Sequence, residues 1–297
     1  MNRPDFDDDL RETAFGLSDI GLQRSSNQDQ FLVARLNKSM LVSSTSLPIG
    51  VPSRLYGQDR GWVLLVADGM GGHAAGETAS SLAIDHLTRE LLNSVHWYFL
   101  DGRDNEAEFV DNLKILLQKA HSRILFESAQ HDSQRGMGTT LTMAYLIWPR
   151  LYVAHAGDSR CYLIRKGTAG QLTTDHTLAR QMVESGGLKP EDEAGSKWSN
   201  VLWNVLGGRA DGQLVAEIHR AELLPGDSVV LCSDGLHRYV DSEQLAQIID
   251  ESADPQVACQ RLIKIANDAG GEDNITVIVC QPNEGVVDHS TWIEEPR

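Results

Sequence analysis

Positive charge is scarce in this sequence. Its 297 residues include 26 Lys and Arg against 42 Asp and Glu, which gives a formal net charge of −16 at pH 7. A surface with this charge repels the phosphates of nucleic acids and of anionic lipids. We therefore expect neither nucleic acid nor a membrane among the partners of the chain.

Long apolar runs are also missing. No stretch of the sequence approaches the roughly 20 apolar residues that a membrane-spanning helix needs. The first ten residues, MNRPDFDDDL, have neither the basic start nor the apolar stretch of a signal peptide. We therefore expect a cytoplasmic protein.

Cysteine is rare and has no metal-binding spacing. The four cysteines, at positions 161, 232, 259 and 280, lie far apart and form no CxxC pair. This spacing excludes a disulfide framework and a zinc ribbon. We expect all four to be small buried side chains in a reducing compartment.

Apolar residues make up 41% of the chain, which is enough for a large core. Their spacing predicts helices that begin near residues 75 and 109 and shortly after Ser242 and Pro255. Period-two or continuous apolar runs predict strands at residues 31–35, 62–67, 140–147, 152–156, 214–218, 228–232 and 275–280.

The order of these elements favours one fold class. Only WPRL separates the strands 140–147 and 152–156, and so short a link forces a tight reversal between antiparallel neighbours. Groups of strands alternate with pairs of helices along the chain. This pattern favours a layered α+β fold over the strict alternation of a doubly wound parallel sheet.

The chain divides into one large domain and two tails. Residues 1–11 are an acidic tail, residues 12–281 carry the periodic elements, and residues 282–297 are polar without periodicity. Residues 37–60 are rich in Ser and contain two prolines, so we expect a long surface loop or an irregular hairpin there. Residues 181–206 mix helix formers with glycines and a proline, which predicts a mobile flap.

Aspartates stand at the ends of several predicted strands. Asp68 and Asp234 each follow an apolar strand and precede a glycine, in VLLVADG and SVVLCSDG. Asp273 comes just before the last predicted strand, Asp29 just before the first, and Asp158 lies in a turn between two strands. Strand ends that meet at one sheet edge would bring these carboxylates together.

Carboxylates that converge in a protein repel one another unless they take up protons or bind cations. These candidates supply only hard oxygen ligands, with no cysteine and no HExxH, which suits Mg²⁺ or Mn²⁺ better than zinc. Two such ions ~4 Å apart can activate a water and stabilise in-line displacement at phosphorus. Arg24, close before Asp29, would bind phosphate oxygens with its planar guanidinium. The pattern predicts phosphoester hydrolysis.

A dinucleotide site is one alternative. Gly69, Gly71 and Ala74 fit the spacing G-x-G-x-x-G/A. Asp68 would then face a pyrophosphate, and the acid about 20 residues later, Glu90, falls inside a predicted helix instead of ending a second strand. Both features argue against this interpretation.

A cysteine-dependent phosphatase is a second alternative, because Cys232 and Arg238 form a C-x5-R pattern. Such a loop must bind a phosphate dianion through its amides, and Asp234 in the middle of the loop opposes this. Cys232 also ends an apolar strand, which predicts a buried and unreactive thiol.

Seven motifs then follow one another in a fixed order: RSSNQD, VADGMGGH, GMGTT, AGDSRCYL, LTTDH, LCSDGL and EDNITV. Together they resemble the PPM (PP2C-type) family of metal-dependent serine/threonine protein phosphatases in its bacterial form, over residues 12–281. The resemblance implies a four-layer α/β/β/α sandwich with a metal centre at one end. It also implies hydrolysis of phosphoserine and phosphothreonine in proteins by direct attack of a metal-bridging hydroxide.

The resemblance assigns roles to five positions of the metal centre. Asp68 would bridge two Mn²⁺ or Mg²⁺ ions, and the carbonyl oxygen of Gly69 would bind one of them. Asp234 and Asp273 would complete the site of the other ion. Asp29 would act through a coordinated water.

Further positions follow or depart from the family pattern. Asp158 matches the ligand of a third, weaker ion, and Arg24 matches the phosphate-binding arginine. Family members often carry an acid four residues after the Asp of SDG, where this chain has Arg238. Met70 replaces a histidine that many eukaryotic members use as a proton donor, so His73 or a water would take that task.

The partners that the resemblance implies are phosphorylated proteins, among them a Ser/Thr kinase and its substrates, and the chain would act as a monomer. A catalytically inactive module that only binds such proteins is the alternative function. The four core ligand positions are all filled, which favours the enzyme. Asn204 stands where the family usually has arginine, and the sequence alone gives this change no consequence.

Overall fold

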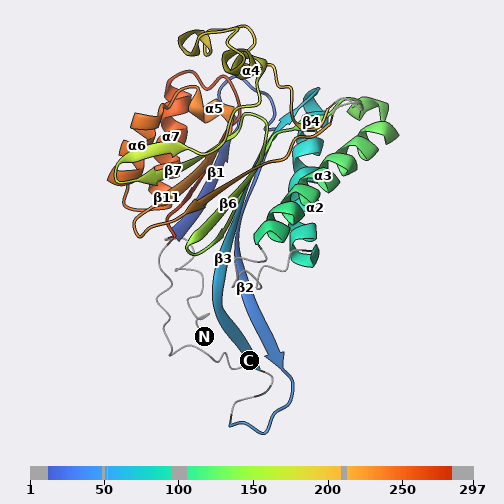
Figure 1. Cartoon of the computed structure of the whole chain (residues 1–297), viewed down its shortest axis with the longest axis vertical. Coiled ribbons are helices and arrows are strands. Elements are labelled where there is room, and N and C mark those ends of the chain that lie inside the picture. The colour runs from blue at the N-terminus through green and yellow to red at the C-terminus, as the bar shows by residue number, and fades with distance from the viewer. Residues whose placement is uncertain (1–12, 49–50, 52, 95–105, 209–212, 283–297) are drawn as a thin grey trace.

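The fold was analysed in a computed structural model of the whole chain, which describes residues 13–48, 51, 53–94, 106–208 and 213–282. Two antiparallel sheets pack face to face, with helices on both outer sides (Figure 1). Helices α2 (His73–Ser94) and α3 (Glu106–Gln130) cover one sheet, and α6 (Ser242–Glu251) and α7 (Pro255–Asp268) cover the other. The predicted α+β sandwich of four layers is confirmed.

The two sheets differ in size, and every strand pairing within them is antiparallel. The seven-stranded sheet has the order β10 (Glu217–Glu222), β6 (Arg150–Ala156), β5 (Leu141–Ile147), β3 (Ser53–Met70), β4 (Gly138–Thr139) and β9 (Leu206–Gly207), with β2 (Asp29–Val42) paired to β3. The five-stranded sheet has the order β1 (Ala14–Asp19), β12 (Ile275–Cys280), β11 (Ser228–Cys232), β7 (Arg160–Arg165) and β8 (Thr168–Gln171).

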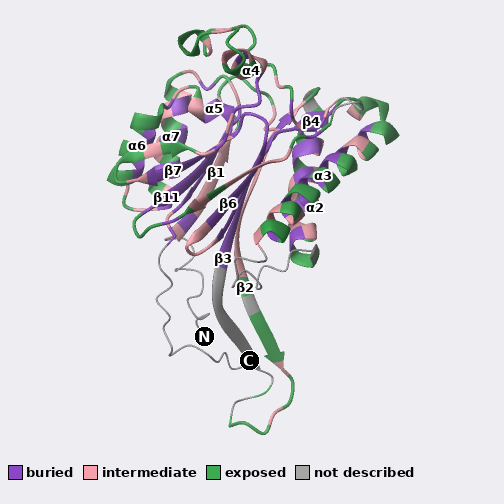
Figure 2. Cartoon of the chain, viewed as in Figure 1, coloured by how far each residue is buried: buried purple, intermediate pink, exposed green. Residues whose placement is uncertain are grey.

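Strand periodicity builds the core on both faces of each sheet. In β12, Ile275, Val277 and Val279 pack with α6 and α7, whereas Ile278 and Cys280 lie between the two sheets. All five side chains are fully buried, because both faces of the strand are covered. The buried strands therefore form the centre of the molecule, and exposed residues lie on the outer faces of the helices, in loops and at the far end of β2 (Figure 2).

The ends of the predicted domain meet in one sheet. Ala14 in β1 pairs with Cys280 in β12, and Gln281 N donates to Thr13 O at 2.7 Å. The sequence analysis did not predict β1, whose short alternating pattern is weak. Of the two predicted tails, residues 1–11 and 282–297, only Pro282 lies within the described residues.

One predicted strand is shifted. The run 214–218 was expected to be a strand, but β10 begins only at Glu217. The Asn204 side chain explains the shift: its Oδ1 accepts from Val215 N at 2.9 Å and its Nδ2 donates to Val215 O at 2.8 Å. The amide therefore takes the place of a neighbouring strand at Val215, which is the consequence that the sequence alone did not give for Asn204.

A long surface loop or an irregular hairpin was expected at residues 37–60, and the described residues of this segment form a hairpin. Strands β2 and β3 continue past both sheets and pair as far as Val42 and Ser53, with a register shift between Asn37 and Ser39. The hairpin extends well beyond the body of the molecule (Figure 1). Met40 in the hairpin is 65% exposed, so this arm adds nothing to the described core.

The segment predicted as a flap contains little regular structure. It holds the end of α4 (Leu178–Glu184) and a short 3-10 turn at Pro190–Asp192. Its base is fixed to α4 by hydrogen bonds from Leu178 N to Val201 O and from Ala179 N to Trp198 O. Its mobility stays a prediction.

The four cysteines are buried and unbridged, as predicted, and burial raises the pKa of Cys232 to about 12. Within the described part of the chain, every helix is too short or too polar to cross a bilayer.

Candidate metal centre

Two of the predicted ligands lie opposite each other on neighbouring strands. Asp29 opens β2 and pairs with Asp68 in β3. The prediction placed Asp68 at the end of its strand, but β3 continues to Met70 because it pairs with β4. Thr140 holds the backbone of Asp68 on both sides, since its N donates to Asp68 O and its Oγ1 accepts from Asp68 N, both at 2.9 Å.

Asp29 connects the first sheet to the second. Its Oδ2 accepts hydrogen bonds from Ser233 Oγ at 2.8 Å and from Thr276 Oγ1 at 2.7 Å. Its Oδ1 is buried and has no hydrogen-bond partner among the described residues. Burial raises the pKa of Asp29 to about 7, against the effect of these two hydroxyl donors.

Asp234 and Asp273 lie just outside two adjacent strands of the second sheet, β11 and β12. Asp234 follows β11 and begins the short helix α5 (Asp234–His237), and its Oδ2 accepts a hydrogen bond from Arg238. Its Oδ1 is buried without a partner in the described structure. Asp273 precedes β12, and its Oδ2 accepts from Arg24 Nη2 at 2.7 Å. The pKa of Arg24 is raised by this hydrogen bond.

The charges of these groups show that they form one cluster. Burial raises the pKa of Asp68 well above its usual range, and the charges of Asp29, Asp234, Asp158 and Asp273 raise it further. Burial, followed by the charge of Asp234, raises the pKa of Asp158 to about 8. The structure therefore brings all five predicted aspartates together, although their ligand roles stay predictions.

The donor set fits hard divalent cations. Five carboxylates lie close enough to repel one another, and buried oxygens of Asp29 and Asp234 lack the hydrogen bonds that buried polar atoms normally make. Bound cations would satisfy these oxygens and offset the repulsion. Carboxylate oxygens without thiolates are the ligands that Mg²⁺ and Mn²⁺ prefer.

For Gly69 and His73, two further residues of the predicted site, the structure describes only the position of the backbone. A Cβ on Gly69 would lie 2.2 Å from the carbonyl oxygen of Gly76, so only glycine fits where β3 passes α2. His73 is the first residue of α2, directly after the glycine turn, and its side chain lies outside the described structure. The roles of the Gly69 carbonyl and of His73 therefore stay predictions.

Sequence analysis missed the residues that hold the centre together. Asn274 Oδ1 accepts from Gln28 N at 2.8 Å, and its Nδ2 donates to Ile20 O and Ser26 O at 2.9 and 3.0 Å. One buried amide thus fixes the loop that carries Arg24 against the start of β12. The motif EDN contained this residue, but no local pattern indicated which distant backbone it would bind.

A second network lies next to the Asp158 turn. The rings of His155 and His176 lie 4.8 Å apart, and Glu217 Oε2 lies 3.1 Å from His176 Nε2. These three residues could in principle hold a metal ion. However, His176 Nδ1 accepts from Gly157 N, and His155 Nε2 contacts Thr174 O at 3.0 Å, so both rings are already used in hydrogen bonds. These contacts give both histidines a structural role in the described chain.

An ion pair close to this network gives a stability prediction. Arg160 binds the Asp175 carboxylate through two nitrogens, with distances of 2.7 to 3.1 Å. Burial alone would raise the pKa of Asp175, but Arg160 lowers it below the usual range. We expect Asp175→Asn to lower the free energy of unfolding at pH 7 by about 3 to 5 kcal/mol, because it leaves Arg160 buried and unpaired.

The pH dependence of this loss has a defined sign. The folded pKa of Asp175 is lowered, so its stabilisation is present above the unfolded pKa of about 4 and disappears as the pH falls through the folded pKa. Urea unfolding of Asp175→Asn and wild type should therefore differ most at neutral pH and converge in acid. Glu251→Gln, which breaks the exposed pair with Arg261, is the control and should change stability little. An equal loss at all pH values would contradict the assignment.

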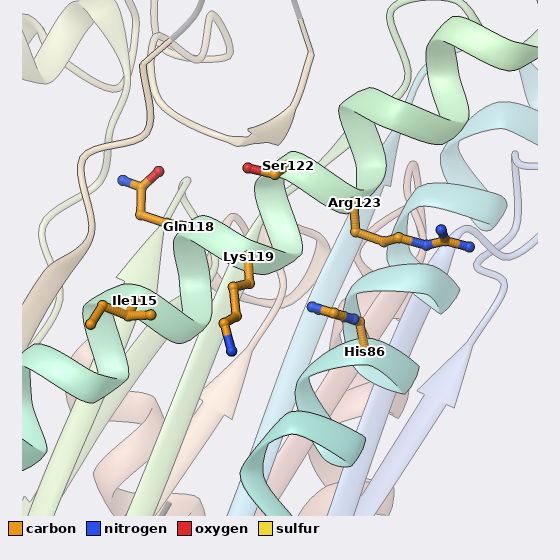
Figure 3. A pocket seen from close by; sticks show the side chains of 6 residues that line it. All are labelled: His86, Ile115, Gln118, Lys119, Ser122 and Arg123. Atoms are coloured by element: carbon orange, nitrogen blue, oxygen red, sulfur yellow. The ribbon is translucent and has the colours of Figure 1, made fainter. Parts of the chain in front are cut away.

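The hollow between α2 and α3 is not part of the acidic cluster. It has a volume of about 480 Å³ and is lined by His86, Ile115, Gln118, Lys119, Ser122 and Arg123 (Figure 3). All six residues come from the two helices, and none is a predicted ligand.

The structure disfavours both alternative sites. β3 runs antiparallel to β2 and β5, and Glu90 lies inside α2, whereas a dinucleotide fold needs parallel strands and an acid at a strand end. The raised pKa of buried Cys232 keeps it a thiol, and Arg238 is bound to Asp234. Both features argue against a cysteine nucleophile in this loop.

Comparisons with known proteins agree with this geometry. The family described as Protein phosphatase 2C matches residues 36–182. Protein phosphatase PhpP of Streptococcus pneumoniae is 32% identical over 271 residues, which cover 90% of this chain and 96% of that protein. The chain belongs to the protein phosphatase 2C family. It is a metal-dependent protein phosphatase.

Solved structures share the fold, and one of them contains metal ions. The serine/threonine phosphatase PstP/Ppp of Mycobacterium tuberculosis superimposes with a TM-score of 0.72 at 29% identity, over 91% of this chain and 98% of that one. The catalytic domain of the serine/threonine protein phosphatase PstP, solved in complex with 2 manganese ions, gives a TM-score of 0.69 at 30% identity, over 91% of this chain and 98% of that one. The phosphatase family to which this chain belongs therefore includes a member with two bound manganese ions.

Proposed function

We propose that this phosphatase hydrolyses phosphoserine and phosphothreonine in proteins at the five-aspartate cluster. The observation that carries the proposal is the pair of buried, unpartnered oxygens, Asp29 Oδ1 and Asp234 Oδ1, within that cluster. Relatives that are named serine/threonine phosphatases support the class of substrate. The filled ligand positions disfavour an inactive binding module.

We propose that two Mn²⁺ or Mg²⁺ ions are held by Asp68, Asp234, Asp273 and the Gly69 carbonyl, with Asp29 acting through water. When bound, these ions would activate a water for attack on phosphorus and neutralise charge in the transition state. The hydroxyls of Ser233 and Thr276 orient Asp29 by binding its Oδ2. Thr140 fixes the backbone of Asp68 at the point from which its carboxylate extends.

Peptide hydrolysis tests the proposal. Matched peptides that carry phosphoserine, phosphothreonine or phosphotyrosine are incubated with the phosphatase and Mn²⁺, and phosphate release is measured. We expect turnover of the first two and little of the third. An absence of release together with an absence of Mn²⁺ binding in calorimetry would support the inactive module instead.

Arg24 is proposed to bind the phosphate group. Its guanidinium is half exposed at the edge of the cluster and reaches Asp273 Oδ2, so substrate oxygens can approach its other nitrogens. We expect Arg24→Ala to raise the KM for a phosphopeptide about tenfold or more, because hydrogen bonds to charged groups contribute about 1.5 to 3 kcal/mol. Mn²⁺ binding, measured by calorimetry, should change much less. Arg24→Lys, which keeps the charge but not the fork, should recover part of the loss.

The remaining features of the function are also proposals. We propose a catalytic domain over residues 12–281, which the pairing of β1 with β12 and of Thr13 with Gln281 supports. Its substrates would be phosphoproteins that include a Ser/Thr kinase and its targets, and the chain would act as a cytoplasmic monomer. Light scattering of the purified chain tests the monomer, and a phosphoproteome comparison with a deletion strain tests the substrates.

A further inference from the structure

One arginine lies among three of the acidic side chains. Arg238 Nη2 binds Asp234 Oδ2, and Arg238 Nη1 lies 3.8 Å from Asp273 Oδ2. Arg238 also interacts electrostatically with Asp158, whose carbonyl oxygen contacts the neighbouring residue His237. A single guanidinium thus neutralises part of the cluster on the side of Asp158.

The backbone holds Arg238 in this position. Arg238 caps the C-terminus of α5, where its N donates to Asp234 O at 3.1 Å. The preceding residue, His237, contacts the carbonyl oxygen of Asp158 through Nε2 at 2.9 Å. Because a carbonyl oxygen can only accept a hydrogen bond, Nε2 of His237 is the donor. Adjacent residues of α5 therefore connect the Asp158 turn to Asp234.

Arg238 does not occupy the oxygens that await a cation. It binds Oδ2 of Asp234, whereas Oδ1 of the same carboxylate is buried and without a partner in the described chain, as is Oδ1 of Asp29. Both residues are more than nine-tenths buried. The guanidinium and the ions of the main centre can therefore bind the same carboxylate at different atoms.

We propose that Arg238 is a permanent cation that takes the place of a third metal ion beside Asp158 and limits the centre to two ions. This inference rests on the proposed metal centre. A carboxylate at position 238 would add a negative charge next to Asp158 and Asp234 and would attract a further divalent ion. The change from a carboxylate to a guanidinium adds two positive charges, which equals the charge of one such ion.

The stoichiometry of Mn²⁺ binding tests this role independently of activity. Free Mn²⁺ is followed by electron paramagnetic resonance while the metal is titrated into wild type, Arg238→Asp and Arg238→Gln. We expect about two ions per chain in wild type and about three in Arg238→Asp. The third ion should bind Arg238→Asp at least about tenfold more tightly than wild type, because a nearby positive charge has become negative.

Arg238→Gln separates loss of the cation from gain of a ligand. We expect its third ion to bind more weakly than in Arg238→Asp but more tightly than in wild type. Arg261→Asp is the matched control, because it makes the same change of charge in the exposed pair with Glu251 and should leave two ions bound. Circular dichroism and thermal melting with EDTA show whether each variant is folded.

The outcomes distinguish this inference from the proposed function. If Arg238→Asp and Arg238→Gln both bind only two ions, or if wild type already binds the third as tightly as Arg238→Asp, the role of Arg238 is wrong and the two-ion centre stands. If Arg238→Gln still binds two ions but holds them more tightly, Arg238 competes with metal and the inference is also wrong. If wild type binds no Mn²⁺, the metal centre itself is wrong.

Discussion

Asp68→Asn is expected to lower kcat/KM for a phosphothreonine peptide by at least about 10³-fold. Asp68 lies at the centre of the cluster, where its charge interacts with those of all four other aspartates. Loss of this carboxylate would weaken the ions that stabilise the transition state, an effect of several kcal/mol. Each 1.36 kcal/mol in the activation barrier corresponds to about a factor of ten in rate.

The fold should survive this substitution. Thr140 and Thr139 bind the backbone of Asp68, not its carboxylate, and asparagine has nearly the same shape. The variant also removes one charge from a set of carboxylates that repel one another. In EDTA we therefore expect Asp68→Asn to melt at a temperature equal to or above that of wild type.

Asp85→Asn is the control for this test. It changes an exposed aspartate of α2 that pairs with Arg89, and it should leave kcat/KM unchanged. The measurement is phosphate release at saturating Mn²⁺ over a range of peptide concentrations. Activity of Asp68→Asn within a few-fold of wild type would show that Asp68 is not a ligand of the catalytic ions.

Chelation is expected to abolish activity completely, and added Mn²⁺ should restore it. Iodoacetamide should have no effect, because all four thiols are buried and burial raises the pKa of Cys232 to about 12. A cysteine-dependent phosphatase would respond in the opposite way to both reagents. The measurement is phosphate release before EDTA, after EDTA and after metal is returned.

Metal binding should also stabilise the fold in a pH-dependent way. Ions that bind only the folded chain add about 2.7 kcal/mol of stability at 100 times their dissociation constant. In the metal-free protein, burial raises the pKa of Asp29 to about 7 and that of Asp158 to about 8, so protons compete with the ions below these values. The rise in melting temperature on addition of Mn²⁺ should therefore be larger at pH 8 than at pH 6. An equal or smaller rise at pH 8 would contradict a cluster that must lose protons to bind metal.

Much of the fold could be predicted because local periodicity reports burial. The alternation in β12 predicted a strand, and the helical spacing after Ser242 and Pro255 predicted α6 and α7. Other elements differ from the prediction. The predicted strand ranges did not include β7, β8 or β1; in β1 only Ala14 is buried, so its alternation is weak. The strand expected from residue 214 begins late because Asn204 binds the backbone of Val215.

The sequence by itself determined which residue types the site contains, because a carboxylate beside a glycine at a strand end is a local pattern. Only the tertiary structure decided how they meet. Arg24 and Asp273 are 249 residues apart, and Ser233 and Asp29 are 204 apart. Likewise, the sequence shows Arg238 only as a departure from a family motif. The fold shows that its guanidinium lies between Asp234 and Asp273. The physical reason is one of range. A local pattern of side chains reports whether a segment forms a helix, a strand or a turn. The pKa values and hydrogen bonds of a site are set by residues from distant segments, which only packing brings together.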